Sequence, residues 1–255
     1  MLIQKLEHYF GQAVKFVTDF ANQTACSSII ELENGERYVV HQQSERAKRL
    51  GINYQLELQI LIKISPLHFM PKVVFHNEDY LILSYIQGSP PQRYNAILLK
   101  KLAEMIAKLH LFDVQEAVIF ISEFAKIDPK LDIIERCYFL NQQLSDSNQF
   151  AVELSLLKPI QPFTQCICHH DLHLGNVIQN EDRVFLIDWE YAAISDPALE
   201  IALFFKHNDL TDEQKRFFLS HYFRLTQFDQ RAFEKKIAEY DPAISLLNKL
   251  WYELS

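Results

Sequence analysis

The chain lacks any hydrophobic run long enough to cross a membrane. Even the apolar stretch that ends at Phe205 is interrupted by the charged residue Glu200. The N-terminus also lacks a basic region followed by a short apolar segment, so we expect no secretory signal. Cysteine is scarce, with 4 in 255 residues. Without a secretory signal, we expect these cysteines to be reduced thiols in a cytoplasmic protein.

The chain also lacks an excess of basic residues. Its 25 Lys and Arg against 33 Asp and Glu give a formal net charge of -8. This balance argues against nucleic acid or an anionic membrane as a partner, and it suits a small cationic substrate. The sequence contains no internal repeat. The hydrophobic fraction of 49% and the length of 255 residues predict one large domain or two modest lobes around a shared cleft.

The most informative stretch of the sequence runs from Cys166 to Phe205. It contains His169 and Asp171 in a His-x-Asp pattern, and Asn176 follows in the same loop. Asp188 stands at the end of the next apolar run. These residue types suit base and metal chemistry, provided that the fold brings them together.

Two short strand-like segments separate Asn176 from Asp188. Residues 177–179 and 183–187 flank a polar turn, which predicts a β-hairpin. A hairpin would bring Asn176, just before its first strand, close to Asp188, just after its second. The two could then hold a divalent cation through oxygen, as Mg²⁺ prefers. Asp171 would stand nearby on a loop, where it could act as a base.

This arrangement matches the phosphoryl-transfer template, in which one Asp takes the acceptor proton while an Asn and a second Asp hold Mg²⁺. The residues resemble the aminoglycoside phosphotransferase and choline kinase family, whose catalytic loop reads H-x-D-x-x-x-x-N and whose metal Asp lies in I-D-[WF]. The sequence at 187–192, IDWEYA, with Asp196-Pro197-Ala198 after it, is most similar to the bacterial thiamine kinase and choline kinase branches. The resemblance implies that Asp171 is the catalytic base, that His169 braces the loop, and that ATP and Mg²⁺ are bound.

The resemblance also implies a two-lobed, protein-kinase-like α+β fold. Such a fold has a small antiparallel-sheet N-lobe with one helix and a mainly helical C-lobe. We place the N-lobe, which covers the nucleotide, at residues 1–88. The C-lobe, at residues 89–255, would carry the catalytic loop, the metal Asp and the acceptor pocket.

Patterns along the chain agree with two lobes. Asn34-Gly35 between strand-like runs predicts a hairpin. The other predicted strands are 13–20, 72–76, 80–85 and 165–168, and the predicted helices are 1–10, 44–64, 94–111, 132–144, 150–157, 198–205, 211–223, 227–240 and 242–254. Gly51 is a candidate break in the second helix.

The nucleotide-binding side departs from the family pattern in two places. The family expects a glycine-containing loop before the first hairpin strand, and residues 22–26 contain no glycine. The family also ends its third strand with Lys or Arg, and His41 occupies that position. Its partner would be Glu57, on the following helix. Both side chains could instead face water, in which case the phosphate-binding cation would come from Arg37, Arg46, Lys48 or Arg49.

In this family the segment between the lobes binds adenine through its backbone. The matching residues here are Ser84, Tyr85 and Ile86, which precede a Gly/Pro stretch. Backbone groups make this contact, so it does not depend on which side chains these positions carry.

The acceptor must present a hydroxyl to Asp171. Thiamine and choline combine a primary alcohol with a positive charge, and such cations bind over aromatic faces near carboxylates. The candidate residues for the wall of this pocket are Trp189, Glu190 and Tyr191 after the metal Asp, and Trp251, Tyr252 and Glu253 at the C-terminus. The alternative for the aromatic residues is packing in the core.

The C-terminal Trp-Tyr-Glu resembles the ending of thiamine kinase, so thiamine is the favoured acceptor. Choline or ethanolamine and an aminoglycoside are the alternatives. A nucleotide-binding pseudokinase is the alternative from another class, because of the absent glycine and His41. The presence of Asp171, Asn176 and Asp188 together argues against a pseudokinase.

Overall fold

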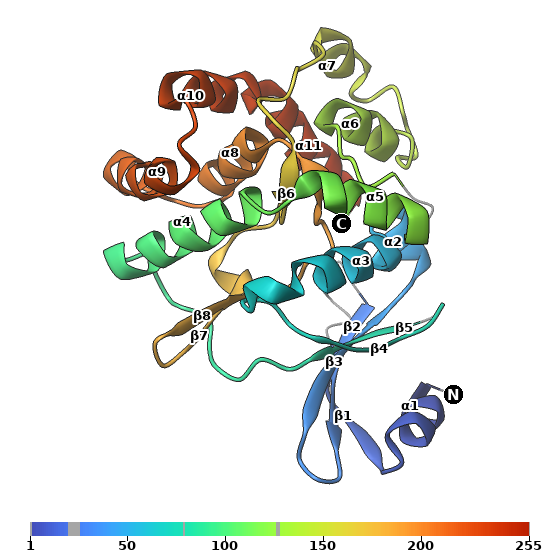
Figure 1. Ribbon diagram of the computed structural model, residues 1–255. Coiled ribbons are helices and arrows are strands. Elements are labelled where there is room, and N and C mark those ends of the chain that lie inside the picture. Colours follow the sequence, from blue (N-terminus) through green and yellow to red (C-terminus); the bar gives the residue numbers. More distant parts are fainter. Residues whose placement is uncertain (1, 20–25, 79, 126–127, 255) are drawn as a thin grey trace.

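The computed structural model describes residues 2–19, 26–78, 80–125 and 128–254 (Figure 1). Residues 22–25 of the predicted phosphate-covering loop lie outside the described residues. No helix in the described part of the chain is long and apolar enough to span a membrane.

The N-lobe is built on a five-stranded antiparallel sheet. Its strands lie in the order β1-β2-β3-β5-β4, and every neighbouring pair is antiparallel. The antiparallel sheet agrees with the predicted N-lobe. Their bounds are β1 Val14–Asp19, β2 Cys26–Leu32, β3 Arg37–Gln42, β4 Val73–His76 and β5 Tyr80–Ser84. The hairpin between β2 and β3 turns at Gly35, whose φ of 85° requires a residue without a side chain.

Side chains alternate between the two faces of this sheet. Ile30, Val40 and Ile82 pack against Leu6 of α1, Leu2–Phe10. Their neighbours on the same strands point to the opposite face, because successive residues of a strand face opposite sides. On β3 this alternation places Val39 and His41 toward the space between the lobes.

The predicted helix 44–64 is divided into α2, Glu45–Arg49, and α3, Tyr54–Ile64. Gly51 lies between them with φ 67°, so the suspected break is real. Each helix begins at a side-chain cap: Ser44 accepts from the N–H of Ala47, and Asn53 caps α3 in the same way. The described part of the N-lobe therefore contains α1, which matches the predicted helix 1–10, and also α2 and α3, whereas the family resemblance implied one helix there.

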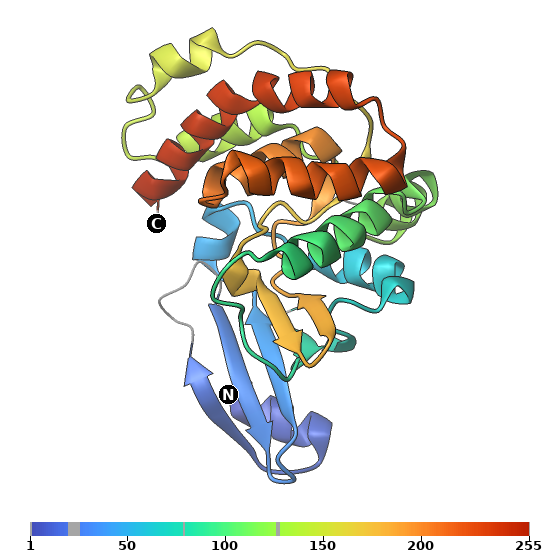
Figure 2. The same cartoon turned by 90° about the vertical axis from the view of Figure 1, so that its left-hand side faces the viewer.

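The connection between the lobes is attached to the C-lobe by its backbone. The Ser89 N–H donates to the carbonyl of Gln179, and the Gln179 N–H donates back to Ser89, at 3.1 and 2.9 Å. Gln179 lies on β7, Val177–Asn180, which pairs with β8, Arg183–Leu186, in the predicted hairpin. Figure 1 and Figure 2 show this hairpin at the end of the C-lobe that faces the N-lobe. The predicted boundary at residues 88 and 89 stays a proposal.

The C-lobe is mainly helical. Helix α4 packs on α9, α11 packs on α6, and α10 packs on α8. The bounds are α4 Ala96–His110, α5 Val114–Ala125, α6 Ile133–Asn141, α7 Ala151–Leu156, α8 Pro197–His207, α9 Asp212–Thr226, α10 Gln230–Glu239 and α11 Asp241–Leu254. Strand β6, Cys166–Cys168, pairs with β9, Ala193–Ser195. Neither α5 nor β9 was predicted from the sequence.

Candidate active site

The catalytic loop follows β6, and a buried carboxylate accepts hydrogen bonds from the backbone of the loop. Glu200 Oε1, on α8, accepts the backbone N–H groups of His169 and His170 at 2.6 and 2.9 Å. Its Oε2 lies 2.5 Å from Nε2 of His110, at the end of α4. This support was not predicted from the sequence, although the single charge of Glu200 inside the apolar sequence of α8 was a sign of it.

Burial and pairing act in opposite directions on these two groups. Burial alone would lower the pKa of His110, but Cys168 and Glu200 raise it to about 9. Burial alone would raise the pKa of Glu200, but the hydrogen bond and charge of His110 lower it to about 2. At neutral pH both groups are charged, so the loop rests on a buried ion pair.

Asp171 lies at the tip of this loop with its carboxylate held in place. Asn176 Nδ2 donates to Asp171 Oδ2 at 2.7 Å and to the Asp171 carbonyl at 2.9 Å. His173 Nε2 lies 3.5 Å from the same carboxylate oxygen. Burial favours the neutral form of Asp171, but His173 and Asn176 outweigh it, and the pKa falls below its ordinary value. Asp171 is therefore an oriented, ionised proton acceptor.

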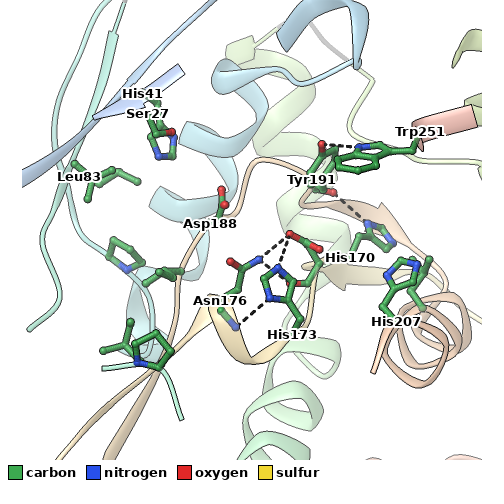
Figure 3. Close-up of a pocket in the computed structure, with 18 of the residues that line it drawn as sticks. Ser27, His41, Leu83, His170, His173, Asn176, Asp188, Tyr191, His207 and Trp251 are labelled. Carbon is green, nitrogen blue, oxygen red and sulfur yellow. Dashed lines mark hydrogen bonds and ion pairs between the residues drawn. The ribbon is translucent and has the colours of Figure 1, made fainter. Parts of the chain in front are cut away.

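The hairpin brings Asn176 and Asp188 together as predicted. The N–H of Ile187, next to Asp188, donates to the Asn176 carbonyl at 2.9 Å. Asp188 adopts φ 63° and points between His41 and Asn176 (Figure 3). Its Oδ1 is buried and has no hydrogen-bond partner among the described residues.

That orphaned oxygen is consistent with a cation site. Burial raises the pKa of Asp188 above its ordinary value, and the negative charges of Glu57 and Asp171 add to the effect. An unpaired buried carboxylate is costly, and a bound divalent cation removes the cost. The Asn176 amide, whose nitrogen is used by Asp171, keeps its oxygen for the same cation.

His41 and Glu57 form a buried pair. His41 is 4% exposed, Glu57 is 1% exposed, and Nδ1 of His41 lies 3.1 Å from Oε2 of Glu57. Burial would lower the pKa of His41, but Glu57 raises it to about 9. The alternative that these side chains face water is therefore wrong, and the pair stands where the family resemblance placed a Lys–Glu pair.

A cavity of about 1090 Å³ runs between the lobes and joins these groups. Its walls include Asp171, Asn176, Asp188 and His41. The segment between the lobes also contributes, through the three residues expected to bind adenine: Ser84, Tyr85 and Ile86.

Two of these three residues already use their N–H groups within the N-lobe. The Ser84 N–H donates to the Lys72 carbonyl at 2.9 Å, and the Tyr85 N–H donates to the Arg37 carbonyl at 3.4 Å. Among the described residues, no bond takes the N–H of Ile86. Of these three residues, Ile86 is therefore the one whose N–H remains for a ligand.

The far end of the cavity is aromatic. Trp251, 37% exposed, donates its Nε1–H to the hydroxyl of Tyr191 at 3.4 Å. Tyr252 lines the cavity beside them. His170 donates from Nδ1 to the Tyr191 carbonyl at 3.2 Å, which ties this wall to the catalytic loop (Figure 3).

Three of the predicted acceptor-binding residues lie elsewhere. Trp189 is 0% exposed, donates to the Leu186 carbonyl and packs on His169, so its interpretation as a pocket wall is wrong. Glu190 is buried outside the cavity wall, and burial and Asp188 raise its pKa.

Glu253 is exposed and also lies outside the cavity wall. The carboxylates among the described cavity-lining residues are those of Asp171 and Asp188. The aromatic wall therefore has no dedicated carboxylate beside it in the described part of the chain.

Comparison with known proteins places this geometry in a family. The model of the phosphotransferase enzyme family matches residues 28–235. The thiamine kinase of Shigella boydii is 21% identical over 246 residues, which cover 93% of this chain and 82% of that protein. An uncharacterised protein of Metamycoplasma hominis is 29% identical over 171 residues, and the match covers 67% of this chain and 33% of that longer protein.

Among solved structures, choline kinase LicA from Streptococcus pneumoniae superposes with a TM-score of 0.72 at 20% identity. The match covers 99% of this chain and 89% of that one. LicA has also been solved in complex with AMP. These likenesses confirm the predicted two-lobed, protein-kinase-like fold.

Proposed function

The chain belongs to the phosphotransferase enzyme family, and we propose that it transfers the γ-phosphate of ATP to the hydroxyl of a small-molecule alcohol. The observation that carries this proposal is the convergence of Asp171, Asn176 and Asp188 on one cavity between the lobes. A neighbour of the same fold, LicA, binds AMP, which supports a nucleotide in this cavity.

In the proposed reaction the acceptor oxygen bonds to the γ-phosphorus while the bond to the bridging oxygen of ADP breaks. Asp171 orients the hydroxyl and receives its proton, for which its lowered pKa keeps it ionised. Asn176 and Asp188 would hold Mg²⁺, which when bound neutralises charge on the phosphates. No covalent enzyme intermediate is needed.

His169 positions this machinery without touching the substrate. Its Nε2 donates to the Ile187 carbonyl at 2.9 Å, next to Asp188, and its Nδ1 accepts the N–H of Asp171 at 3.3 Å. One neutral imidazole thus joins the base to the metal-binding strand. Burial lowers the pKa of His169, which favours this neutral form.

For the acceptor we propose a cationic alcohol, with thiamine first. Trp251, Tyr191 and Tyr252 supply aromatic surface beside the catalytic loop, as a cation–π site requires. Similarity to thiamine kinase over most of the chain supports thiamine, and the fold shared with choline kinase keeps choline or ethanolamine as the second candidate. An aminoglycoside is less well supported, because its amines call for more carboxylates than the described wall provides.

The test is ADP release with Mg-ATP against thiamine, choline, ethanolamine and one aminoglycoside. We expect release stimulated by one cationic alcohol, and thiamine to be the best of the four. Stimulation by another member would change the acceptor but keep the reaction. ATP binding without release for any acceptor would favour the pseudokinase and contradict the proposed activity.

A further inference from the structure

His41 is a short and already partnered replacement for the family's phosphate-binding cation. Its Nδ1 faces Glu57, whose negative charge offsets that of the imidazolium. An imidazole also extends less far from the backbone than a lysine or arginine side chain. Triphosphate next to the carboxylates of Asp171 and Asp188 brings further negative charge into the cavity, which favours a second protein cation in addition to the Mg²⁺ that Asn176 and Asp188 would hold.

Three of the four candidate cations from β3 and α2 lie outside the cavity wall. Arg37, at the start of β3, pairs with Glu31 at 2.7 Å. Lys48 pairs with Glu45 at 2.7 Å on the surface of α2. Arg49 donates to the carbonyl of Gln143 at 3.2 Å.

None of those three is among the described residues that line the cavity, whereas Arg46 is. Arg46 enters the cavity wall from α2, the helix that follows His41. Arg136 also lines the cavity, but its guanidinium donates to the carbonyls of Leu50 and Gly51. If Arg136 bound a phosphate, it would have to give up these bonds.

The backbone that carries Arg46 is held from both lobes. Ala47 and Leu50 are buried with Tyr191 and Leu254 of the C-lobe. Arg136 of α6 fixes the end of α2 through the same two carbonyls. An exposed guanidinium on a fixed backbone suits the outer, terminal phosphates.

We infer that Arg46 is the second phosphate-binding cation of this site and contacts the terminal phosphates of the nucleotide, an inference that rests on the proposed use of ATP. His41 and Glu57 form the inner half of the clamp, and Arg46 forms the outer half. Arg46 thereby compensates for the lysine that the third strand lacks.

The test measures binding of Mg-ATP and of AMP to the full-length protein without any acceptor, by calorimetry. Arg46→Gln should weaken ATP binding roughly 10- to 100-fold, the loss expected for a hydrogen bond to a charged group, and leave AMP binding unchanged. Arg46→Lys should restore part of the ATP affinity. Lys48→Gln, on the same helix but outside the cavity wall, is the matched control and should bind both nucleotides as the wild type does.

Two results would overturn the assignment of Arg46. Arg46→Gln could bind ATP as well as Lys48→Gln does, or it could lose ATP and AMP equally while its thermal unfolding stays normal. Failure of the proposed function gives a different result, because the wild type itself would then bind neither nucleotide. Since no acceptor is present, the identity of the alcohol does not affect the outcome.

Discussion

Asp171 is the residue on which the proposed chemistry depends most directly. Asp171→Asn keeps the side-chain shape and the bond from Asn176 but removes the proton acceptor. We expect turnover to fall by a factor on the order of thousands while ATP binding is retained, because a positioned general base contributes about 10²- to 10⁴-fold. Steady-state ADP release and calorimetric ATP binding measure the two quantities.

The matched control for that change is Asp182→Asn. Asp182 is an exposed residue of the turn between β7 and β8, on the same hairpin that carries the metal-binding residues. Turnover of this variant should equal that of the wild type. A rate near normal for Asp171→Asn would remove Asp171 from the mechanism.

His41 makes the stability of the N-lobe dependent on pH. Its pKa is raised from 6.5 to about 9 in the folded protein, so the folded state holds the proton more tightly than the unfolded state. The stabilisation is therefore full below pH 6.5 and is lost as the pH rises through about 9.

The comparison is the free energy of unfolding in urea for the wild type and His41→Gln across that range. We expect the wild type to be more stable by on the order of 2 kcal/mol near pH 6, and the difference to shrink as the pH approaches 9. A difference that stays constant with pH would show that the pKa of His41 is the same in the folded and the unfolded protein.

At the scale of elements, the crossing between the lobes depends on Gly88. It has φ 143°, and a Cβ there would collide with the carbonyl of Gln179 on β7. Gly88→Ala should therefore lower the free energy of unfolding by about 2 to 3 kcal/mol, from backbone strain and loss of the Ser89–Gln179 pairing. Urea denaturation measures the loss.

The variant Gly35→Ala measures how much free energy of unfolding is lost to backbone strain alone, without a collision. Gly35 also has a positive φ, of 85°, but a Cβ at that position meets no atom within 4 Å. It should cost only about 1 kcal/mol, from strain alone. Equal losses for the two variants would mean that the contact with β7 contributes nothing.

Most elements with a strong local pattern were predicted from the sequence, although α5 was missed despite the capping bond from the Glu116 N–H to Asp113 at its start. The Asn34-Gly35 hairpin and the start of α8 at Asp196-Pro197 are local features, and both occur as expected. Strand β9 has three residues and exists because it pairs with β6, which is distant in sequence. The division of 44–64 at Gly51 depends on a tertiary contact as well, since Arg136 bonds to the carbonyl there.

At the scale of the whole molecule, proximity in sequence was a poor guide to the acceptor pocket. Trp189 and Glu190 directly follow Asp188, yet the chain turns there with a positive φ and directs both into the protein interior. The aromatic wall instead joins Tyr191 with Trp251, residues far apart along the chain. The catalytic loop could be predicted because the hairpin keeps its parts local. Tyr191 and Trp251 could be proposed for the wall only from the family resemblance, because no local pattern shows that two residues so far apart along the chain meet.

The buried pair of His110 and Glu200 joins α4, α8 and the catalytic loop, so its effect extends over the whole C-lobe. Glu200→Gln keeps an acceptor for the loop N–H groups but removes the charge that His110 requires. Breaking a buried pair by removing one partner is expected to cost about 3 kcal/mol near neutral pH. Turnover should fall as well, because the loop that carries Asp171 loses part of its support.

The signs of the two pKa shifts define where that difference is greatest. Glu200 is lowered from 4.5 to about 2, so its stabilisation is present above pH 4.5 and is lost as the pH falls through about 2. His110 is raised from 6.5 to about 9, so its stabilisation is present below pH 6.5 and is lost as the pH rises through about 9. The difference between wild type and Glu200→Gln should therefore be greatest between pH 4.5 and 6.5 and decline on both sides.

Urea denaturation across the pH range measures this profile, with Glu239→Gln as the control. Glu239 pairs with Lys236 on the surface of α10 at 2.6 Å, so its loss should change the free energy of unfolding by less than about 1 kcal/mol at any pH. A flat profile for Glu200→Gln, parallel to that of Glu239→Gln, would mean that the pair is not ionised. The catalytic loop would then be supported by neutral hydrogen bonds alone, which act equally at every pH where the fold persists.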